Sequence, residues 1–267
     1  MIPVPSRRSR SIEWDEYAAP WLDAAPQRLW RMHSDALNAR LLSRWLPAER
    51  MGLIVKTDLF DEAVTQGLYP ALIERANHVA AIDISAKVAV AAHGRHCAMH
   101  VVAADVRAIP LRDGCADAIV SLSTLDHFDT PDDIPDAMAE VYRILRPGGM
   151  LILTMDNPSN PILAVRNSLP FSIVHRAGLV PYPVGRTHGA RSMCRLTEEA
   201  GFDIVDRTSV MHAPRLLAIQ ALRLADSEGR KSQMRVARTL MAFERLERLP
   251  SRFFTGHFIA IQAIKPN

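Results

Sequence analysis

The chain lacks several features that would mark particular classes of protein. It has only three cysteines, Cys97, Cys115 and Cys194, an odd number spread along 267 residues, which argues against a disulfide framework and for a reducing compartment. No apolar run approaches the roughly 20 residues that a membrane-spanning helix needs. The basic N-terminus, MIPVPSRRSRS, is not followed by an apolar segment, so it makes a poor signal peptide. These absences predict a cytoplasmic protein without integral membrane association.

An excess of charge and a metal-binding pattern are also missing. The chain has 32 basic and 29 acidic residues and a net charge of only +3, so no electrostatic field indicates a nucleic-acid partner. The ten histidines are scattered, and none forms an i, i+4 pair beside an acid, so we expect no metal site. The 48% of hydrophobic residues is enough to bury the core of one α/β domain.

Glycine is absent from residues 56–66, the first turn of the most informative stretch of the chain. An apolar run from Leu53 to Val55, a helix-length stretch with Leu68 and Leu72, and a second apolar run ending at Asp83 predict a strand, a helix and a strand. Such a unit usually binds a nucleotide cofactor over a glycine-rich first turn. Here residues 56–66 contain no glycine, and Gly67 is the first.

The alternation of strands and helices continues along the chain and predicts a doubly wound, mostly parallel sheet. We expect further strands at residues 100–104, 118–122, 150–155, 202–211 and 254–265, and helices at 86–92, 135–145 and 192–200. Two basic helices are expected within 215–249, around residues 227–229.

The ends and insertions of this sheet define the domain organisation. Residues 1–50 are predicted to form a mobile arm to about residue 12 and then a helical cap, broken at Pro20 and Pro26 and rich in tryptophan. Residues 51–267 form the main domain, with insertions near 157–190 and 214–251. The first insertion is punctuated by proline and glycine, which favours an irregular lid.

Three motifs resemble those of the class I S-adenosylmethionine-dependent methyltransferases of the small-molecule type. They are VAAIDIS (79–85), AADVRAIPLRDGCADAIVSLSTLDHF (103–128) and ILRPGGMLILT (144–154), and the resemblance covers roughly residues 53–265. It implies a Rossmann-like seven-stranded sheet with helices on both faces, an antiparallel last strand, and S-adenosyl-L-methionine as cofactor.

The resemblance also implies roles for particular residues. Asp83 would bind the ribose hydroxyls, and Ile84 would pack on the adenine. Asp105 would accept from the adenine amino group, with a backbone contact from Val106 beside it. The fourth strand and the loop after it would border the methionine part of the cofactor with Ser121 and Ser123.

The first motif, KTDLFDEA, departs from the family pattern. The family has an acid two residues before a Gly-x-Gly-x-Gly turn, and the strand register puts Lys56 at the position of that acid. Asp58 would share a strand face with Lys56 and could replace the acid through a turn of unusual length. The remaining candidates for cofactor contacts in this segment are Thr57, Glu62 and Gly67.

Three interpretations of this motif remain open. In the first, Asp58, Asp61 or Glu62 takes the amino group of the cofactor, Lys56 pairs with its carboxylate, and the protein is a methyltransferase. In the second, the cofactor binds in an altered pose and serves a lyase or cyclase. In the third, the domain is a non-catalytic cofactor-binding protein or scaffold.

The loops after the fourth and fifth strands supply the candidates for chemistry. His127 has a reference pKa near 6.5 and could act as general base, oriented by Asp126 or Asp129, while Asn157 could bind substrate. The cap and the lid supply further substrate candidates, Tyr17, His33, Tyr182 and Arg186. The aromatic cap favours a small hydrophobic metabolite as acceptor, with a homodimer left open.

Overall fold

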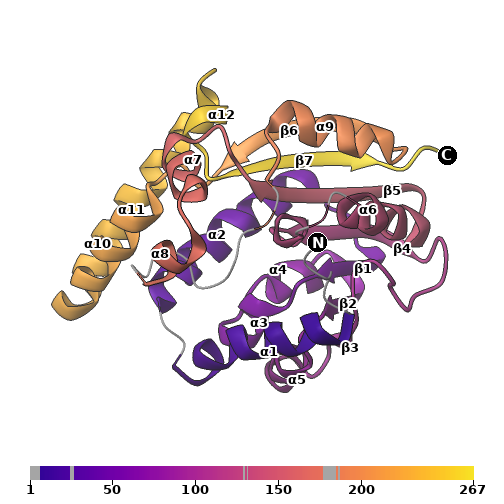
Figure 1. The fold of residues 1–267 in the computed structure, drawn as a ribbon, viewed down its shortest axis with the longest axis horizontal. Helices are drawn as coiled ribbons and strands as arrows, with labels where there is room; N and C mark the ends of the chain where they lie inside the picture. Colours follow the sequence, from indigo (N-terminus) through magenta and orange to yellow (C-terminus); the bar gives the residue numbers. More distant parts are fainter. Residues whose placement is uncertain (1–6, 25–26, 129, 131, 177–184, 186) are drawn as a thin grey trace.

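The computed structural model describes residues 7–24, 27–128, 130, 132–176, 185 and 187–267 and is built around one seven-stranded sheet (Figure 1). The strands lie in the order β3-β2-β1-β4-β5-β7-β6. Strands β1 to β5 pair in parallel, and β7 is antiparallel to both of its neighbours. The predicted Rossmann-like sheet with an antiparallel last strand is therefore confirmed. The strand bounds are β1 Met51–Thr57, β2 Ala76–Asp83, β3 His100–Ala103, β4 Ala116–Leu122, β5 Leu145–Asp156, β6 Asp203–Val210 and β7 Phe258–Ile264.

Successive side chains of the central strands enter two different cores, as the two-residue repeat of a strand requires. In β1, Ile54 packs in one core and Val55 in the other. In β4, Ile119 joins the core of Val55, and Val120 joins that of Ile54. The uninterrupted apolar runs of the sequence are thus strands buried on both faces, which is typical of parallel sheets.

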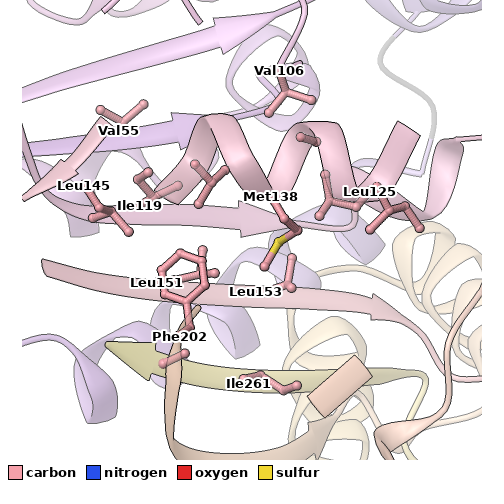
Figure 2. Packing of buried hydrophobic residues seen from close by; sticks show 14 of the residues in the cluster. Val55, Val106, Ile119, Leu125, Met138, Leu145, Leu151, Leu153, Phe202 and Ile261 are labelled. Carbon is pink, nitrogen blue, oxygen red and sulfur yellow. The ribbon is translucent and has the colours of Figure 1, made fainter. Parts of the chain in front are cut away.

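Helices α6 (Asp133–Ile144) and α9 (Ala190–Glu199) cover the face of the sheet that carries Val55. Met138 of α6 is fully buried and points toward Leu153 of β5 (Figure 2). Phe202, which precedes β6, packs in the same cluster near Leu151. The amphipathic pattern of α6 is therefore satisfied by the middle of the sheet.

Five helices cover the opposite face. Helix α5 (Ala86–Arg95) and the short helices α3 (Phe60–Val64) and α4 (Tyr69–Ile73) pack on β1 and β2. Helix α2 (Arg28–Trp45) buries Leu42 and Trp45 in the same core, and α1 (Arg7–Ala24) lies along α3 and α5 (Figure 1). The N-terminal helical cap is therefore part of one side of the domain.

The insertions form a separate group of helices at one end of the sheet (Figure 1). Helices α10 (Arg215–Glu228) and α11 (Arg230–Phe243) pack side by side, as predicted from the basic segment, and α10 docks on α2 through a cluster that includes Trp30 and Leu222. The other members of the group are α7 (Pro161–Ser168), α8 (Phe171–Arg176), the 3-10 segment η2 (Glu244–Arg248) and α12 (Arg252–Thr255).

Several expected boundaries were wrong. The helix expected after β1 is split into α3 and α4, because Thr65 has an extended backbone and Gly67 a positive φ of 53°. The irregular lid expected at 158–189 contains α7 and α8, since Asn160 caps α7 by accepting from Ile162 N–H. The last strand begins only at Phe258, because residues 252–255 form α12.

The N-terminal arm was also predicted wrongly. Helix α1 begins at Arg7 and runs through Pro20 without a break. Pro20 lies on the exposed side of the helix, where loss of one backbone hydrogen bond is offset by the docking of the opposite side on α5. Pro26 lies outside the described residues. No helix in the described part of the chain is long and apolar enough to cross a bilayer.

We predict that Leu151→Ala destabilises the fold by about 2–5 kcal/mol. Leu151 lies on β5 and is fully buried in the core that α6 covers, so its truncation leaves a cavity. Urea denaturation would measure the change. The matched control is Leu217→Ala, since Leu217 is 71% exposed, and its effect should stay within about 0.5 kcal/mol. Equal effects of the two substitutions would contradict the described core.

Candidate functional site

A cavity lies at the carboxyl ends of β1, β2 and β4, which is where ligands bind in open parallel α/β sheets. Its outer wall is α1, so helix and sheet enclose it together. In this closed arrangement its volume is about 110 Å³, which is smaller than the ~300 Å³ at the lower end of small-molecule sites. A whole nucleotide cofactor therefore requires α1 to move outward. The lining residues are Arg10, Trp14, Ala18, Thr57, Asp58, Phe60, Ile82, Asp83, Ile84, Ser85, Val88, Ala104, Asp105, Val106, Thr124, His127 and Phe128.

The turn after β1 is short, and Asp58 forms its corner. Only Asp58 and Leu59 separate β1 from α3, so the expected long turn is wrong and the extra residues lie between α3 and α4. Asp58 has a φ of 85°, a conformation that glycine adopts most easily and aspartate more readily than most residues. It stands two residues after Lys56, where the family has its first glycine. The backbone geometry of the glycine turn is therefore kept without the glycine.

Lys56 does not face the cavity. Its ammonium donates to Glu62 Oε2 at 2.9 Å and to the carbonyl of Asp58, and both side chains are buried. Burial alone would lower the pKa of Lys56, but Glu62 and Asp58 raise it above its ordinary value. Because φ of Asp58 ends the strand, Lys56 and Asp58 do not share a face, and that expectation was wrong.

Glu62 and Gly67, two other candidates from this segment, surround the Lys56 ion pair and do not line the cavity. Glu62 is fully buried and also accepts from Leu68 N–H. Gly67 lies against Glu62, and a Cβ there would come within 2.6 Å of the Glu62 carboxyl group. Asp61 is paired with Arg31 of α2. Of the three acids considered for the amino group, Asp58 is the one that lines the cavity.

Asp83 ends β2 and lines the cavity, and its carboxylate already holds the two neighbouring turns. Oδ2 accepts from Leu59 N–H at 2.8 Å, and Oδ1 accepts from Ser85 N–H at 2.8 Å. An ionised carboxylate can accept about four hydrogen bonds. Each oxygen therefore retains a lone pair that a vicinal diol could meet.

Two carboxyl groups of the cavity are difficult to ionise together. Burial raises the pKa of Asp58 to about 6, although Lys56 opposes the shift. Burial and then the neighbouring Asp58 raise the pKa of Asp83 to about 7. A ligand that brings hydrogen-bond donors or a cation between them would favour the ionised forms.

Asp105 and Val106 follow β3 and also line the cavity. The Asp105 carboxylate is held by Arg107, whose Nε lies 2.9 Å from Oδ1 and whose Nη2 lies 2.5 Å from Oδ2. Arg107 also pairs with Asp133 of α6. An adenine amino group would therefore have to share Asp105 with Arg107, which the sequence did not predict.

Helix α1 is attached to the cavity edge by a few polar contacts. Arg10 binds Asp133 at 3.2 Å, and Ser11 donates to the carbonyl of Ile84 at 2.9 Å. Asp15 accepts from the hydroxyl of Ser85 and from Lys87 N–H at the start of α5. The acid at this helix N-terminus is favourable because the first backbone N–H groups of a helix lack partners within it.

His127 also lines the cavity and lies in the 3-10 turn η1 (Leu125–His127), which follows β4. Its ring meets the edge of Trp14 with centroids 5.1 Å apart. His127 Nε2 is 4.0 Å from Asp126 Oδ1, and that oxygen makes no hydrogen bond to the described residues. Catalytic hydrogen bonds are often long before substrate binds.

Asp126 is buried and its carboxylate is held by two hydrogen bonds, while Asp129 lies outside the described residues. Oδ2 of Asp126 accepts from the Ser123 hydroxyl at 2.9 Å and from Asp156 N–H at 3.0 Å. Burial raises the pKa of Asp126. Ser123 has a φ of 52°, so the residues that hold Asp126 sit in a locally strained turn at the end of β4.

Several predicted site residues lie elsewhere. Asn157 donates to the carbonyls of Phe253 and Gly256 and accepts from Ser159 N–H, so its amide fixes the loop before β7 and is not presented to the cavity. Ser121 is fully buried and accepts from the Thr57 hydroxyl. Ser123 positions Asp126 and does not line the cavity.

The substrate candidates from the cap are not at the cavity either. Tyr17 donates to Glu13 on the outer side of α1. His33 is buried beside Trp30 in α2, and burial lowers its pKa. Tyr182 and Arg186 lie outside the described residues.

Sequence reasoning missed the contribution of α1. Of the four tryptophans, Trp14 lines the cavity, while Trp21, Trp30 and Trp45 are buried in the helical packing. Arg10 was assigned to the mobile arm, because its partner Asp133 is 123 positions away. Thr124 and Phe128 belong to the second quoted motif, residues 103–128, and their place in the loop beside His127 was the available signal. The described residues contain no cluster of three or more acids, histidines or cysteines that could hold a metal ion.

The parallel sheet with antiparallel β7, and the cavity at the ends of β1 and β2, define a nucleotide-cofactor protein of the class I methyltransferase architecture. A family model described as "Methyltransferase domain" matches residues 61–153. The malonyl-[acyl-carrier protein] O-methyltransferase of Enterobacter lignolyticus is 35% identical over 153 residues, which cover 54% of this chain and 54% of that protein. The chain thus matches about half the length of this relative.

Solved structures share the fold at low sequence identity. The [4+2]-cyclase SpnF has a TM-score of 0.57 at 17% identity, covering 99% of this chain and 98% of its own. The geranyl diphosphate C-methyltransferase of Streptomyces coelicolor has a TM-score of 0.53 at 17% identity, covering 87% and 78%. These matches and the fold make the chain similar to the class I S-adenosylmethionine-dependent methyltransferases, whose cofactor is S-adenosylmethionine.

The residues of the cavity fit that cofactor. Asp83 presents acceptors suited to a ribose diol, Ile84 and Val106 supply apolar surface beside it, and Asp58 brings a negative charge to the first turn. Asp58 follows β1, Asp83 and Ile84 lie at the end of β2, and Val106 follows β3. These three strands are neighbours in the sheet.

We predict that Asp58 and Asp83 contribute a decrease in the free energy of unfolding as pH rises from about 4 to about 7, opposed by an increase from the buried histidines His33, His96, His212 and His257, whose pKa values burial lowers. The folded-state pKa values of Asp58 and Asp83 lie above that of an unfolded aspartate, ~3.9, so the folded protein retains protons that the unfolded chain releases. Asp83→Asn should flatten part of this slope, measured by urea denaturation at a series of pH values. Asp113→Asn, which removes a carboxylate on a side chain that is 80% exposed, is the control. The same slope in wild type and Asp83→Asn would contradict the assignment.

Proposed function

We propose that this chain transfers the methyl group of S-adenosylmethionine to a small apolar acceptor, with His127 beside the reacting atoms. The observation that carries the proposal is that Asp83 and His127 line one cavity. An acid suited to the ribose and a proton acceptor thus line a single site. The acceptor's apolar character is supported by Trp14, Phe60 and Phe128 in the same lining.

The bound cofactor supplies an electrophilic methyl group on a sulfonium centre. The chain's part is to align an acceptor with that group, to exclude water and to remove a proton. Trp14 and α1 close the site to solvent. His127 takes the proton of the acceptor, and Asp126 stabilises the imidazolium that results, through the oxygen that faces the ring at 4.0 Å.

The curated relative in Enterobacter lignolyticus is named as an O-methyltransferase, and this supports an oxygen atom as the acceptor. A hydroxyl acceptor must lose its proton as the new bond to the methyl group forms, which agrees with a histidine at the cavity wall. A lyase or cyclase is the second candidate, because the chain lacks the glycines of the first turn and because the fold is shared with a [4+2]-cyclase.

Calorimetry with S-adenosylmethionine and S-adenosylhomocysteine, followed by product analysis, tests these alternatives. Binding together with acceptor-dependent formation of S-adenosylhomocysteine is the expected result. Conversion of the cofactor without an acceptor would favour the lyase or cyclase, and binding without any conversion would favour a non-catalytic protein. No binding of either compound would overturn the proposed use of the cavity.

We predict that His127→Ala lowers the turnover number by about 10²–10⁴-fold, the usual contribution of a general base, and changes the cofactor Kd by less than about threefold. Turnover is measured by the release of S-adenosylhomocysteine. His78→Ala removes an exposed histidine on β2 and should leave both values unchanged. A similar rate for His127→Ala and wild type would exclude His127 as the base.

We predict that Asp58→Gly weakens cofactor binding by about tenfold or more, because it removes a hydrogen bond to a charged group worth ~1.5–3 kcal/mol. Glycine adopts the φ of 85° without strain, which offsets part of the loss of the hydrogen bond from Phe60 N–H to the Asp58 carboxylate, so Asp58→Gly should be less destabilising than Asp58→Ala. Asp58→Ala also removes the carboxylate but retains a Cβ, and it should lose stability as well as affinity. Unchanged affinity in Asp58→Gly would show that Asp58 does not contact the cofactor.

A further inference from the structure

A second, larger cavity lies among the insertion helices and shares no lining residue with the cofactor cavity. Its volume is about 810 Å³, within the ~300–1,000 Å³ of small-molecule sites. It is formed by α7, by the segment that links β6 to α10, and by the residues around η2 and α12. The lining residues are Asn160, Pro161, Ile162, Leu163, Val165, Arg166, Leu169, Met211, His212, Ala213, Pro214, Arg215, Leu216, Phe243, Leu246, Phe254, Thr255 and His257.

The cavity gathers apolar side chains that are exposed to solvent. Val165 is 63% exposed and Phe254 is 61% exposed. Ile162, Leu169, Leu216 and Phe243 are also large, apolar and exposed, and all six line the cavity. A contiguous apolar surface of this kind marks a binding site, whereas scattered exposed residues do not.

The charged side chains of the lining have one sign. Arg166 and Arg215 line the cavity, and no acidic residue is among the described residues that do so. Arg166 is paired with Asp156, which is buried behind the lining. Arg215 lies on the same side as Trp30, with its guanidinium 5.9 Å from the ring centroid. An apolar surface with an arginine pair suits a ligand that has an apolar chain and an anionic end.

The floor of the cavity is His257, whose ring is buried. Its Nε2 makes no hydrogen bond to the described residues and lies 3.5 Å from Asp156 Oδ1. Burial lowers the pKa of His257 to about 4; Asp156 opposes this shift and Arg215 adds to it. A neutral ring at this position adds no charge beside the two arginines.

A buried link joins this floor to the cofactor cavity. Asp156 N–H donates to Asp126, and Asp126 faces His127 at 4.0 Å. Asp156 is therefore in contact with His257 and Arg166 on one side and with the Asp126–His127 pair on the other. The second cavity thus lies next to the proposed catalytic residues, at the end of β5.

We infer that this second cavity binds an aliphatic carboxylate, with its chain on the exposed apolar residues and its carboxylate between Arg166 and Arg215. The inference concerns binding alone and does not depend on the proposed function, because the second cavity shares no lining residue with the cofactor cavity. The six apolar residues and the two arginines specify the two ends of one ligand, which neither group alone would do.

Titration calorimetry of the full chain without cofactor tests the inference with decanoate, decanol and butyrate. Decanoate should bind at least about tenfold more tightly than decanol, which lacks the charge, and than butyrate, which lacks most of the chain. Equal binding of decanol would overturn the role of the arginines. No binding of decanoate would overturn the inference as a whole.

Two matched substitutions locate the site. Val165→Glu places a carboxylate in the cavity and should weaken decanoate binding by at least about tenfold, whereas Val205→Glu, at a valine of β6 that is 54% exposed outside the lining, should change it by less than about twofold. Similar effects of the two would contradict the location. Cofactor titrations on both variants separate the two claims. Binding of decanoate without binding of the cofactor would support this site and contradict the proposed function. Binding of the cofactor without binding of decanoate would contradict this site and leave the proposed function standing.

Discussion

The carboxylate of Asp83 joins the two turns on which the cofactor cavity is built. It accepts from Leu59 N–H in the turn after β1 and from Ser85 N–H in the turn after β2. Ser85 in turn caps α5 and donates to Asp15 of α1. A single acid at the end of one strand therefore sets the positions of α3, α5 and the helix that closes the site. This explains why burial of a carboxyl group is tolerated there.

The buried pair of Lys56 and Glu62 has the same importance on the other side of β1. A buried ion pair adds little net stability, but removal of one partner typically costs about 3–5 kcal/mol because the remaining charge is left without compensation. The pair occupies the space beneath the first turn and turns the lysine away from the cavity. The charge of Lys56 is thus neutralised inside the protein, and Asp58, not Lys56, lines the cavity.

Much of the fold followed from local patterns, because strands buried on both faces leave continuous apolar runs and helices leave a periodic one. Asp83, Asp105 and His127 could be placed at strand ends for the same reason. The role of Lys56 could not, since its direction depends on the φ of one residue, Asp58. Arg107 in contact with Asp105, and α1 as the cavity wall, depend on contacts between distant parts of the chain that no local pattern contains. The prediction that Asn157 binds substrate was wrong for a different reason. Asn157 does follow a strand end, but its side-chain amide donates to backbone carbonyls before β7.

The position of α1 has a kinetic consequence. The helix closes a cavity of about 110 Å³ and is attached to its rim by a few polar contacts, one of them between residues 123 positions apart. A ligand larger than the closed space can enter only while the helix is displaced, so the association rate follows the fraction of time that α1 is open and falls below the diffusion limit. Once seated, the ligand would hold the helix closed, and its release would wait for the same motion. Exchange of a ligand bound in this cavity would then be a gated step, set by the motion of the N-terminal helix.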